Sequence, residues 1–175
     1  MARILLSGVR CRLATLGIAI AATSSHAGPW SVDADGGMQL APLADDDVFG
    51  RLAVAVRYAW HDRWIAGARL SFAIDPSTSM ALPSGANIRS YLIEGGVRLH
   101  PSARLGIELG WRVGRAGIDF GFAYVHTTDL EPFAALTVPL GAPLELRIEP
   151  LVVDLYRSST WQTTIGVNAG LAWRL

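Results

Sequence analysis

The chain has 175 residues, of which 51% are apolar, and its 15 basic residues, all arginine, balance 15 acidic ones. No basic patch or stripe is present, which argues against a nucleic-acid partner. After residue 27 no apolar run reaches the roughly 20 residues that a membrane-spanning helix needs, so a helical membrane protein is excluded.

Residues 1–27 predict a secretory signal peptide. Three arginines and an apolar core over residues 13–22 precede small residues at the two positions that a signal peptidase recognises. We expect cleavage before Gly28, which leaves residues 28–175 as one domain. Three of the 15 basic residues go with the signal, so 12 remain against 15 acidic ones, a net charge of −3. The single cysteine, Cys11, is also removed, and the mature domain is expected to contain no disulfide.

Beyond the signal peptide, apolar and polar residues alternate in eight segments separated by turn signals, a pattern typical of strands with one polar face. The first four segments cover residues 30–38, 51–60, 64–75 and 90–100. The second of them is the most regular, with Leu52, Val54 and Val56 on one face and Arg51 and Arg57 on the other.

The other four segments cover residues 105–114, 130–140, 144–152 and 161–175. The stretch from Arg115 to Asp129 is left open, as a loop or as extensions of the two neighbouring strands beyond the bilayer. Pro150 interrupts the seventh segment, because proline has no N–H to donate to a neighbouring strand. Strict alternation there places Val152 on the outward face and Leu151 on the inward one.

The predicted connections alternate in length. Those after the second, fourth and sixth segments are tight, and those after the first, third, fifth and seventh are expected to be longer. Outer-membrane barrels have short periplasmic turns at one end and longer loops at the other. The sequence therefore predicts an all-β fold, an eight-stranded antiparallel up-and-down transmembrane β-barrel.

Charged side chains gather on the polar faces of the second to eighth segments and are absent from the apolar faces. We expect them to line the lumen and to pair there, because an unpaired buried charge is costly. These lumen residues are Arg51, Arg57, Arg69, Glu94, Arg98, Glu108, Arg112, Glu131, Glu145, Arg147, Glu149 and Arg174.

A soluble barrel would instead turn the apolar faces inward. Those faces carry several tryptophans, whereas the interior of an eight-stranded barrel is barely wide enough for side chains to fill it. Turning the polar faces toward lipid would cost roughly 2–4 kcal/mol for each arginine at mid-bilayer. We therefore expect a membrane barrel with the charges inside and the tryptophans outside.

Aromatic residues concentrate near the ends of the predicted strands. Two girdles at the membrane interfaces are typical of outer-membrane barrels. The expected interface residues are Trp30, Trp60, Trp64 and Trp173 near the short turns, with Phe72, Tyr91 and Trp161 near the longer loops.

The last segment, WQTTIGVNAGLAWRL, alternates to the end of the chain, with Val167, Leu171, Trp173 and Leu175 on its apolar face. In this strand and in the whole pattern, the domain resembles the small eight-stranded outer-membrane barrels, the group of the OmpA transmembrane domain and OmpX. The resemblance implies a bacterial outer-membrane location and recognition of the last strand by the barrel-assembly machinery. Leu175 stands where that signal usually ends in an aromatic residue.

One eight-stranded barrel of that group, the lipid A deacylase, uses a His and a Ser two residues apart, backed by a Glu. The similar positions here are His126 and Thr128, with Glu131 as the nearest candidate for the supporting Glu. A base can activate a threonine hydroxyl as a nucleophile, so a lipid A-modifying hydrolase is the enzyme alternative. A loop histidine without a catalytic role is the simpler interpretation.

No zinc-ligand spacing, phosphate-binding glycine loop or nucleophile elbow is present in the sequence. We predict no cofactor and no metal site. The predicted function is a structural or interaction role for a monomeric outer-membrane barrel with a packed, charged lumen. Its partners would be outer-membrane lipid and lipopolysaccharide. A narrow channel is a further alternative.

Overall fold

The computed structural model describes residues 28–41, 47–74, 87–119, 123–157 and 161–175, and the predicted signal peptide lies outside these residues. The strands are β1 (Trp30–Ala41), β2 (Asp47–Trp60), β3 (Trp64–Ile74), β4 (Asn87–Ser102), β5 (Leu105–Asp119), β6 (Tyr124–Gly141), β7 (Leu144–Arg157) and β8 (Trp161–Arg174). Within the described part of the chain, no helix is long and apolar enough to cross a bilayer.

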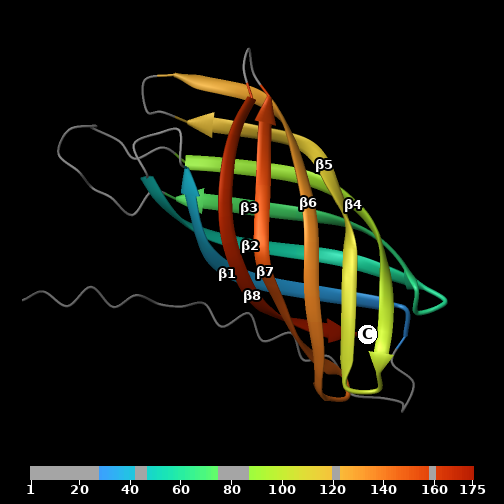
Figure 1. Cartoon of the computed structure of the whole chain (residues 1–175). Helices are drawn as coiled ribbons and strands as arrows, with labels where there is room; N and C mark the ends of the chain where they lie inside the picture. Colours follow the sequence, from blue (N-terminus) through green and yellow to red (C-terminus); the bar gives the residue numbers. More distant parts are fainter. Residues whose placement is uncertain (1–27, 42–46, 75–86, 120–122, 158–160) are drawn as a thin grey trace, which may run out of the picture.

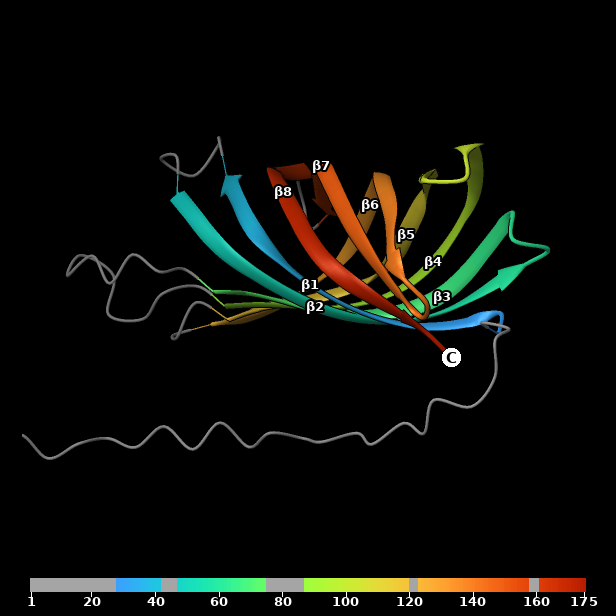
Figure 2. The ribbon, with the colours of Figure 1, turned by 90° about the horizontal axis from the view of Figure 1, so that it is seen from below.

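The strands form a closed antiparallel barrel. Each strand pairs with its neighbours in sequence, and β1 also pairs with β8, so that no strand has a free edge. Figures 1 and 2 show the strands running obliquely around the wall. Beside the β1–β8 seam, the Gly28 amide donates a hydrogen bond to the Leu175 carbonyl at 2.5 Å. The predicted eight-stranded up-and-down barrel is confirmed.

Tight turns join β2 to β3, β4 to β5 and β6 to β7, and Figure 1 shows them at the end of the barrel where the chain ends. We call this the turn end and the opposite end the loop end. At the loop end, twelve residues separate β3 from β4, five separate β1 from β2, and four separate β5 from β6. The expected longer connection after the seventh strand is wrong: only three residues separate β7 from β8, as many as in the β2–β3 turn.

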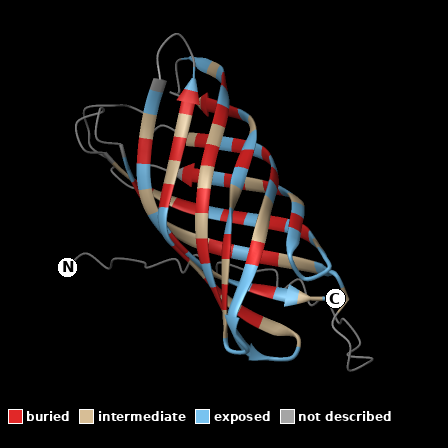
Figure 3. Cartoon of the chain, turned by 45° about the vertical axis from the view of Figure 1, so that its right-hand side comes forward, coloured by how far each residue is buried: buried red, intermediate tan, exposed pale blue. Residues whose placement is uncertain are grey.

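Side chains alternate between a buried and an exposed position along most of each strand (Figure 3). In β2, the inward-facing residues Arg51, Ala53 and Arg57 are almost fully buried. On the outward face, Leu52 is 63% exposed and Val54 is 51% exposed. The polar faces therefore line the lumen, and the apolar faces form the outer wall.

A bulge in β7 breaks this alternation. Glu149 pairs with Asn168 and Val152 with Gly166, so β7 holds one more residue than β8 between these two pairs. The extra residue lies at Pro150, which has no N–H for the ladder. The predicted faces of the next two residues are therefore wrong: Leu151 is 53% exposed and Val152 fully buried.

The stretch that the sequence left open, Arg115 to Asp129, is mostly strand. β5 continues to Asp119 and β6 begins at Tyr124, and the two extensions pair with each other. Tyr124 lies over Gly117, where an added Cβ would collide with the tyrosine ring. Of the two alternatives, extension of the strands is the one that the structure contains.

Candidate functional site

Paired charges fill the lumen. Of the twelve charged residues predicted for it, eleven are at most 8% exposed, and the twelfth, Arg174, has a side chain 26% exposed at the turn end. The structure adds four buried carboxylates, so that nine carboxylates face seven arginines. The added residues are Asp33, Asp35, Asp129 and Asp154.

Arg112 is the centre of this network. Its guanidinium is fully buried and contacts carboxylates from three other strands: Glu94 at 3.0 Å, Glu131 and Glu149. Each of these three carboxylates also pairs with a second arginine. Such multiple ion pairs compensate for the loss of hydration, which is the condition under which a buried charge is tolerated.

Further arginines extend the network toward the turn end. Arg57 contacts Asp33 at 2.9 Å and Glu108 at 3.0 Å. Arg147 also binds Glu108, at 2.9 Å. Arg174 then contacts Glu145 at 2.5 Å near the mouth. Glu108 of β5 thereby joins two strands that are not its neighbours, β2 through Arg57 and β7 through Arg147.

Toward the loop end, Arg51 bridges Glu131 at 2.5 Å and Asp154 at 3.1 Å. Asp154 also accepts hydrogen bonds from Gln39 on β1 and from Tyr156. Asp154 lies beyond the β7 bulge, which turns it into the lumen. A strict alternation count places it outside, and sequence reasoning therefore missed it.

The other three added carboxylates were missed for different reasons. Asp33 and Asp35 share the polar parity of the first strand, and this signal was visible in the sequence. Asp35 pairs with Arg69 through two hydrogen bonds of 2.6 and 2.7 Å. Asp129 falls in the stretch for which the sequence left the structure open.

Phe133 occupies the middle of the charged lumen. Its ring is 4% exposed and lies under three guanidiniums, with the Arg112 carbon 4.3 Å, the Arg147 carbon 5.4 Å and the Arg57 carbon 6.0 Å from the ring centroid. Such cation–π contacts are favourable, most of all where water is excluded. The ring and the arginines together block the lumen.

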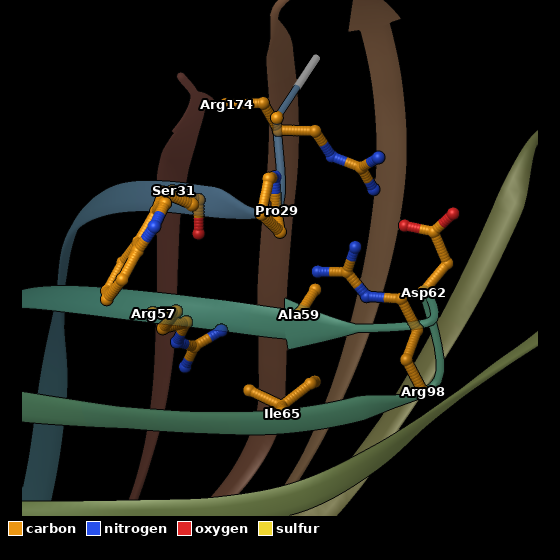
Figure 4. A pocket seen from close by; sticks show the side chains of 10 residues that line it. Pro29, Ser31, Arg57, Ala59, Asp62, Ile65, Arg98 and Arg174 are labelled. Atoms are coloured by element: carbon orange, nitrogen blue, oxygen red, sulfur yellow. The ribbon is translucent and has the colours of Figure 1, made fainter. Parts of the chain in front are cut away.

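The two ends of the lumen differ from its middle. At the loop end, an apolar cluster that includes Phe49, Ile88 and Tyr156 is buried across the barrel. At the turn end, Figure 4 shows a cavity near Arg57, Arg98 and Arg174. Its volume is about 10 Å³, no more than one water molecule requires. Among the described residues, Arg112, Phe133 and the apolar cluster thus place buried side chains in the middle of the lumen and at its loop end.

The three candidate catalytic residues do not come together. His126 and Thr128 are exposed on the outer face of β6, whereas Glu131 is fully buried in the lumen against Arg51 and Arg112. Glu131 lies five positions after His126 on β6, and an odd offset along one strand places side chains on opposite faces. The proposed partnership of Glu131 with His126 is wrong.

His126 and Thr128 instead line a hollow of about 490 Å³ on the outer face near the loop end, together with Thr127, Arg115 and Arg157. The ring of Tyr124 stands edge-on to His126, with the ring centroids 4.9 Å apart. This hollow places a histidine, the Thr128 hydroxyl and two arginines beside one another on the exposed outer face, whereas the Thr127 side chain is buried.

The predicted interface aromatics that the structure describes lie on the outer wall. Trp60 is 60% exposed and Trp64 54% at the turn end, and Tyr91 is 63% exposed toward the loop end. Trp30, Phe72 and Trp173 are exposed as well. The side chain of Trp161 lies outside the described residues. The residues of the predicted assembly signal, Val167, Leu171, Trp173 and Leu175, are all exposed on the outer side of β8 or just after it.

No family model matches the sequence, and no curated protein is similar to it in sequence. Solved structures resemble it in fold. Neisserial surface protein A superposes with a TM-score of 0.69 at 13% identity, over 85% of this chain and 98% of that one. A major outer membrane protein from Thermus thermophilus has a TM-score of 0.58 at 12% identity, over 86% and 100%. The outer membrane enzyme PagL has a TM-score of 0.55 at 9% identity, over 83% and 99%.

These similarities extend over nearly the full length of each solved barrel, at identities that bear on the fold alone. The closed antiparallel wall agrees with them. The chain has the fold of the small eight-stranded outer-membrane β-barrels.

Proposed function

We propose that the protein is an integral barrel of the bacterial outer membrane with a closed lumen and a structural or interaction role at the cell surface. The observation that carries the proposal is the inverted distribution of polarity. Charged groups such as Arg112 and Glu131 are fully buried, whereas large apolar side chains such as Ile93, at 66%, are exposed. A soluble protein rarely exposes a continuous apolar wall, but lipid covers such a wall.

The closed hydrogen-bonded wall supports the same proposal. In a bilayer core, backbone N–H and C=O groups find no water, and a β-structure satisfies them only when it has no edge. The β1–β8 seam removes that edge. In the proposed orientation the turn end faces the periplasm and the loop end faces outward, as in other barrels of this kind.

The test is the migration of the protein from a purified outer-membrane fraction on a detergent gel, with and without boiling. We expect a boiling-dependent shift in that fraction, because a closed barrel resists detergent until it is heated. Recovery in the soluble periplasm, without any shift, would contradict the proposal.

A lipid A-modifying hydrolase is the second candidate. One observation favours it. His126 and Thr128 line one exposed hollow at the loop end, which in the proposed orientation lies near the outer leaflet of the membrane. Lipid A from cells with and without the protein, and with His126→Asn, distinguishes the candidates by mass. Unchanged lipid A in all three strains eliminates the hydrolase, whereas loss of an acyl chain that depends on His126 supports it.

A further inference from the structure

We propose that the outer face of β5–β7 near the loop end binds the phosphorylated headgroup of an outer-leaflet glycolipid of the lipid A class. The inference rests on the proposed membrane location. The site is the hollow between Arg115 and Arg157. These two arginines lie on the outer face and take no part in the ion-pair network of the lumen.

The strand register places these groups in one row. Arg115 on β5 pairs with Thr128 on β6, and Thr128 pairs with Arg157 on β7. Adjacent strands lie about 4.8 Å apart, so the two arginine Cα atoms are separated by roughly 10 Å. Two long guanidinium side chains at this spacing can converge on one phosphate between them, and the Thr128 hydroxyl can donate to it as well.

Arg115 has no carboxylate partner within the described ranges of the chain, unlike the arginines of the lumen. Arg89 lies on the same outer face, where it pairs in register with Gly117 of β5, and is also exposed. Among the described residues beside this row, Asp119 at the end of β5 is the carboxylate on the outer face, so it stands against Arg89, Arg115 and Arg157. The charge of the region is therefore positive, which fits an anionic headgroup.

An apolar surface begins one step below this row. Two residues toward the turn end, Val113, Leu130 and Leu155 occupy the corresponding positions of β5, β6 and β7. The arginines therefore lie at the membrane interface, and the apolar side chains lie deeper in the membrane. A lipid has the same order, with its phosphate at the interface and its acyl chains below. A soluble anion would gain nothing from this arrangement.

A second hollow continues the site. Its volume is about 480 Å³, and Val54, Ala68, Tyr91 and Ile93 are among the residues that line it on the outer face of β2–β4. Ala68 is small and lies between Val56 and Ile93 of the neighbouring strands, and we assign the hollow over it to an acyl chain of the bound lipid. Tyr91 pairs in register with Arg115 and so connects the groove to the headgroup hollow.

The experiment is a titration of the full barrel, purified from outer membranes in detergent, followed by native mass spectrometry. The probes are bis-phosphorylated lipid A, its dephosphorylated form and phosphatidylglycerol. We expect binding in the order lipid A, phosphatidylglycerol, dephosphorylated form. Arg115→Gln with Arg157→Gln should weaken lipid A binding by about tenfold or more, the size of one lost charge-assisted hydrogen bond.

Matched variants test the location. Arg63→Gln with Arg104→Gln removes the same charge from exposed positions at the turn end, and lipid A binding should not change. Ala68→Phe fills the groove and should weaken binding, whereas Ala66→Phe changes the same strand and face outside the hollow and should not.

Equal loss of affinity in both double variants, or equal binding of phosphatidylglycerol and lipid A, would overturn the proposal. Loss of an acyl chain from the bound lipid would replace it with the hydrolase. The boiling-dependent gel shift is recorded for each preparation. A shift without preferential binding refutes this site alone, whereas absence of the shift refutes the membrane barrel itself.

Discussion

At the scale of single residues, Arg112 shows how ion pairs compensate for the burial of a charge in the lumen. It lies in contact with Glu94, Glu131 and Glu149 and is fully removed from water. The strength of these pairs depends on all partners being present, because removal of one partner leaves an uncompensated buried charge.

Replacement of Arg112 by Met should therefore lower the free energy of unfolding by about 3–5 kcal/mol. The measurement is the urea midpoint of the barrel folded in detergent micelles, followed by the gel shift. Arg104→Met, at an exposed turn position, is the control and should change stability by less than about 0.5 kcal/mol. Equal midpoints for the two variants would mean that the lumen network is not a major source of stability.

Adding Glu131→Gln to Arg112→Met should restore part of the lost stability, because Glu131 keeps only Arg51 as an ion-pair partner in the single variant and the double variant removes the negative charge that Arg112 balanced. Residues in one network are expected to couple in this way. Strictly additive losses in the two single variants and the double variant would show that Arg112 and Glu131 do not act together.

At the scale of the strand, the β7 bulge determines which side chains face the lumen. Pro150 is the extra residue, and beyond it Val152 and Asp154 point inward. Because the bulge holds one residue more than the neighbouring strands, the ladder can lose that residue without a change of register on either side.

Deletion of Pro150 should accordingly leave a folded barrel with a normal gel shift. Deletion of Val54 is the matched control, since β2 pairs without any register shift and has no spare residue. That deletion would turn Arg57 toward lipid, at a cost of roughly 2–4 kcal/mol for this arginine alone. If both deletions fold equally well, the alternation of faces does not govern the stability of the wall.

The last strand, β8, allows a prediction about assembly. Trp173 is 39% exposed on the lipid side of β8 and makes no part of the lumen network. We expect Trp173→Ser to reduce the folded fraction in the outer membrane of living cells, while the purified variant refolds in detergent as well as the wild type. Equal defects in both settings would indicate a structural role instead of recognition by the assembly machinery.

At the scale of the whole molecule, the lumen determines whether the barrel conducts. Phe133 and the ion-pair network lie in its middle, the apolar cluster lies at the loop end, and the described turn-end cavity has a volume of about 10 Å³. Ions would have to cross a region in which the charged groups are already paired with one another.

The whole barrel should therefore show no single-channel steps in a planar bilayer, under conditions in which an added porin conducts. Protease protection of the reconstituted protein verifies that it has inserted. Discrete conductance steps from the inserted protein would refute the closed lumen and revive the narrow-channel alternative.

The local pattern of the sequence was sufficient for the fold and for most of the lumen. Alternation with a period of two assigns each side chain to one face of a strand, and Arg51 and Arg57 in β2 follow it without exception. The energetic difference between lipid and a closed interior then decides which face points inward. Both arguments depend on neighbouring residues alone, and they therefore hold without knowledge of the tertiary structure.

Only the tertiary structure decided the features that depend on pairing between strands. The extra residue at Pro150 is visible only in the register with β6 and β8, and Asp154 could not be assigned to the lumen without it. The three carboxylates around Arg112 come from β4, β6 and β7, far apart in sequence. The register of β5, β6 and β7 also brings Arg115, Thr128 and Arg157 into one row, because strand pairing positions side chains that no local pattern relates.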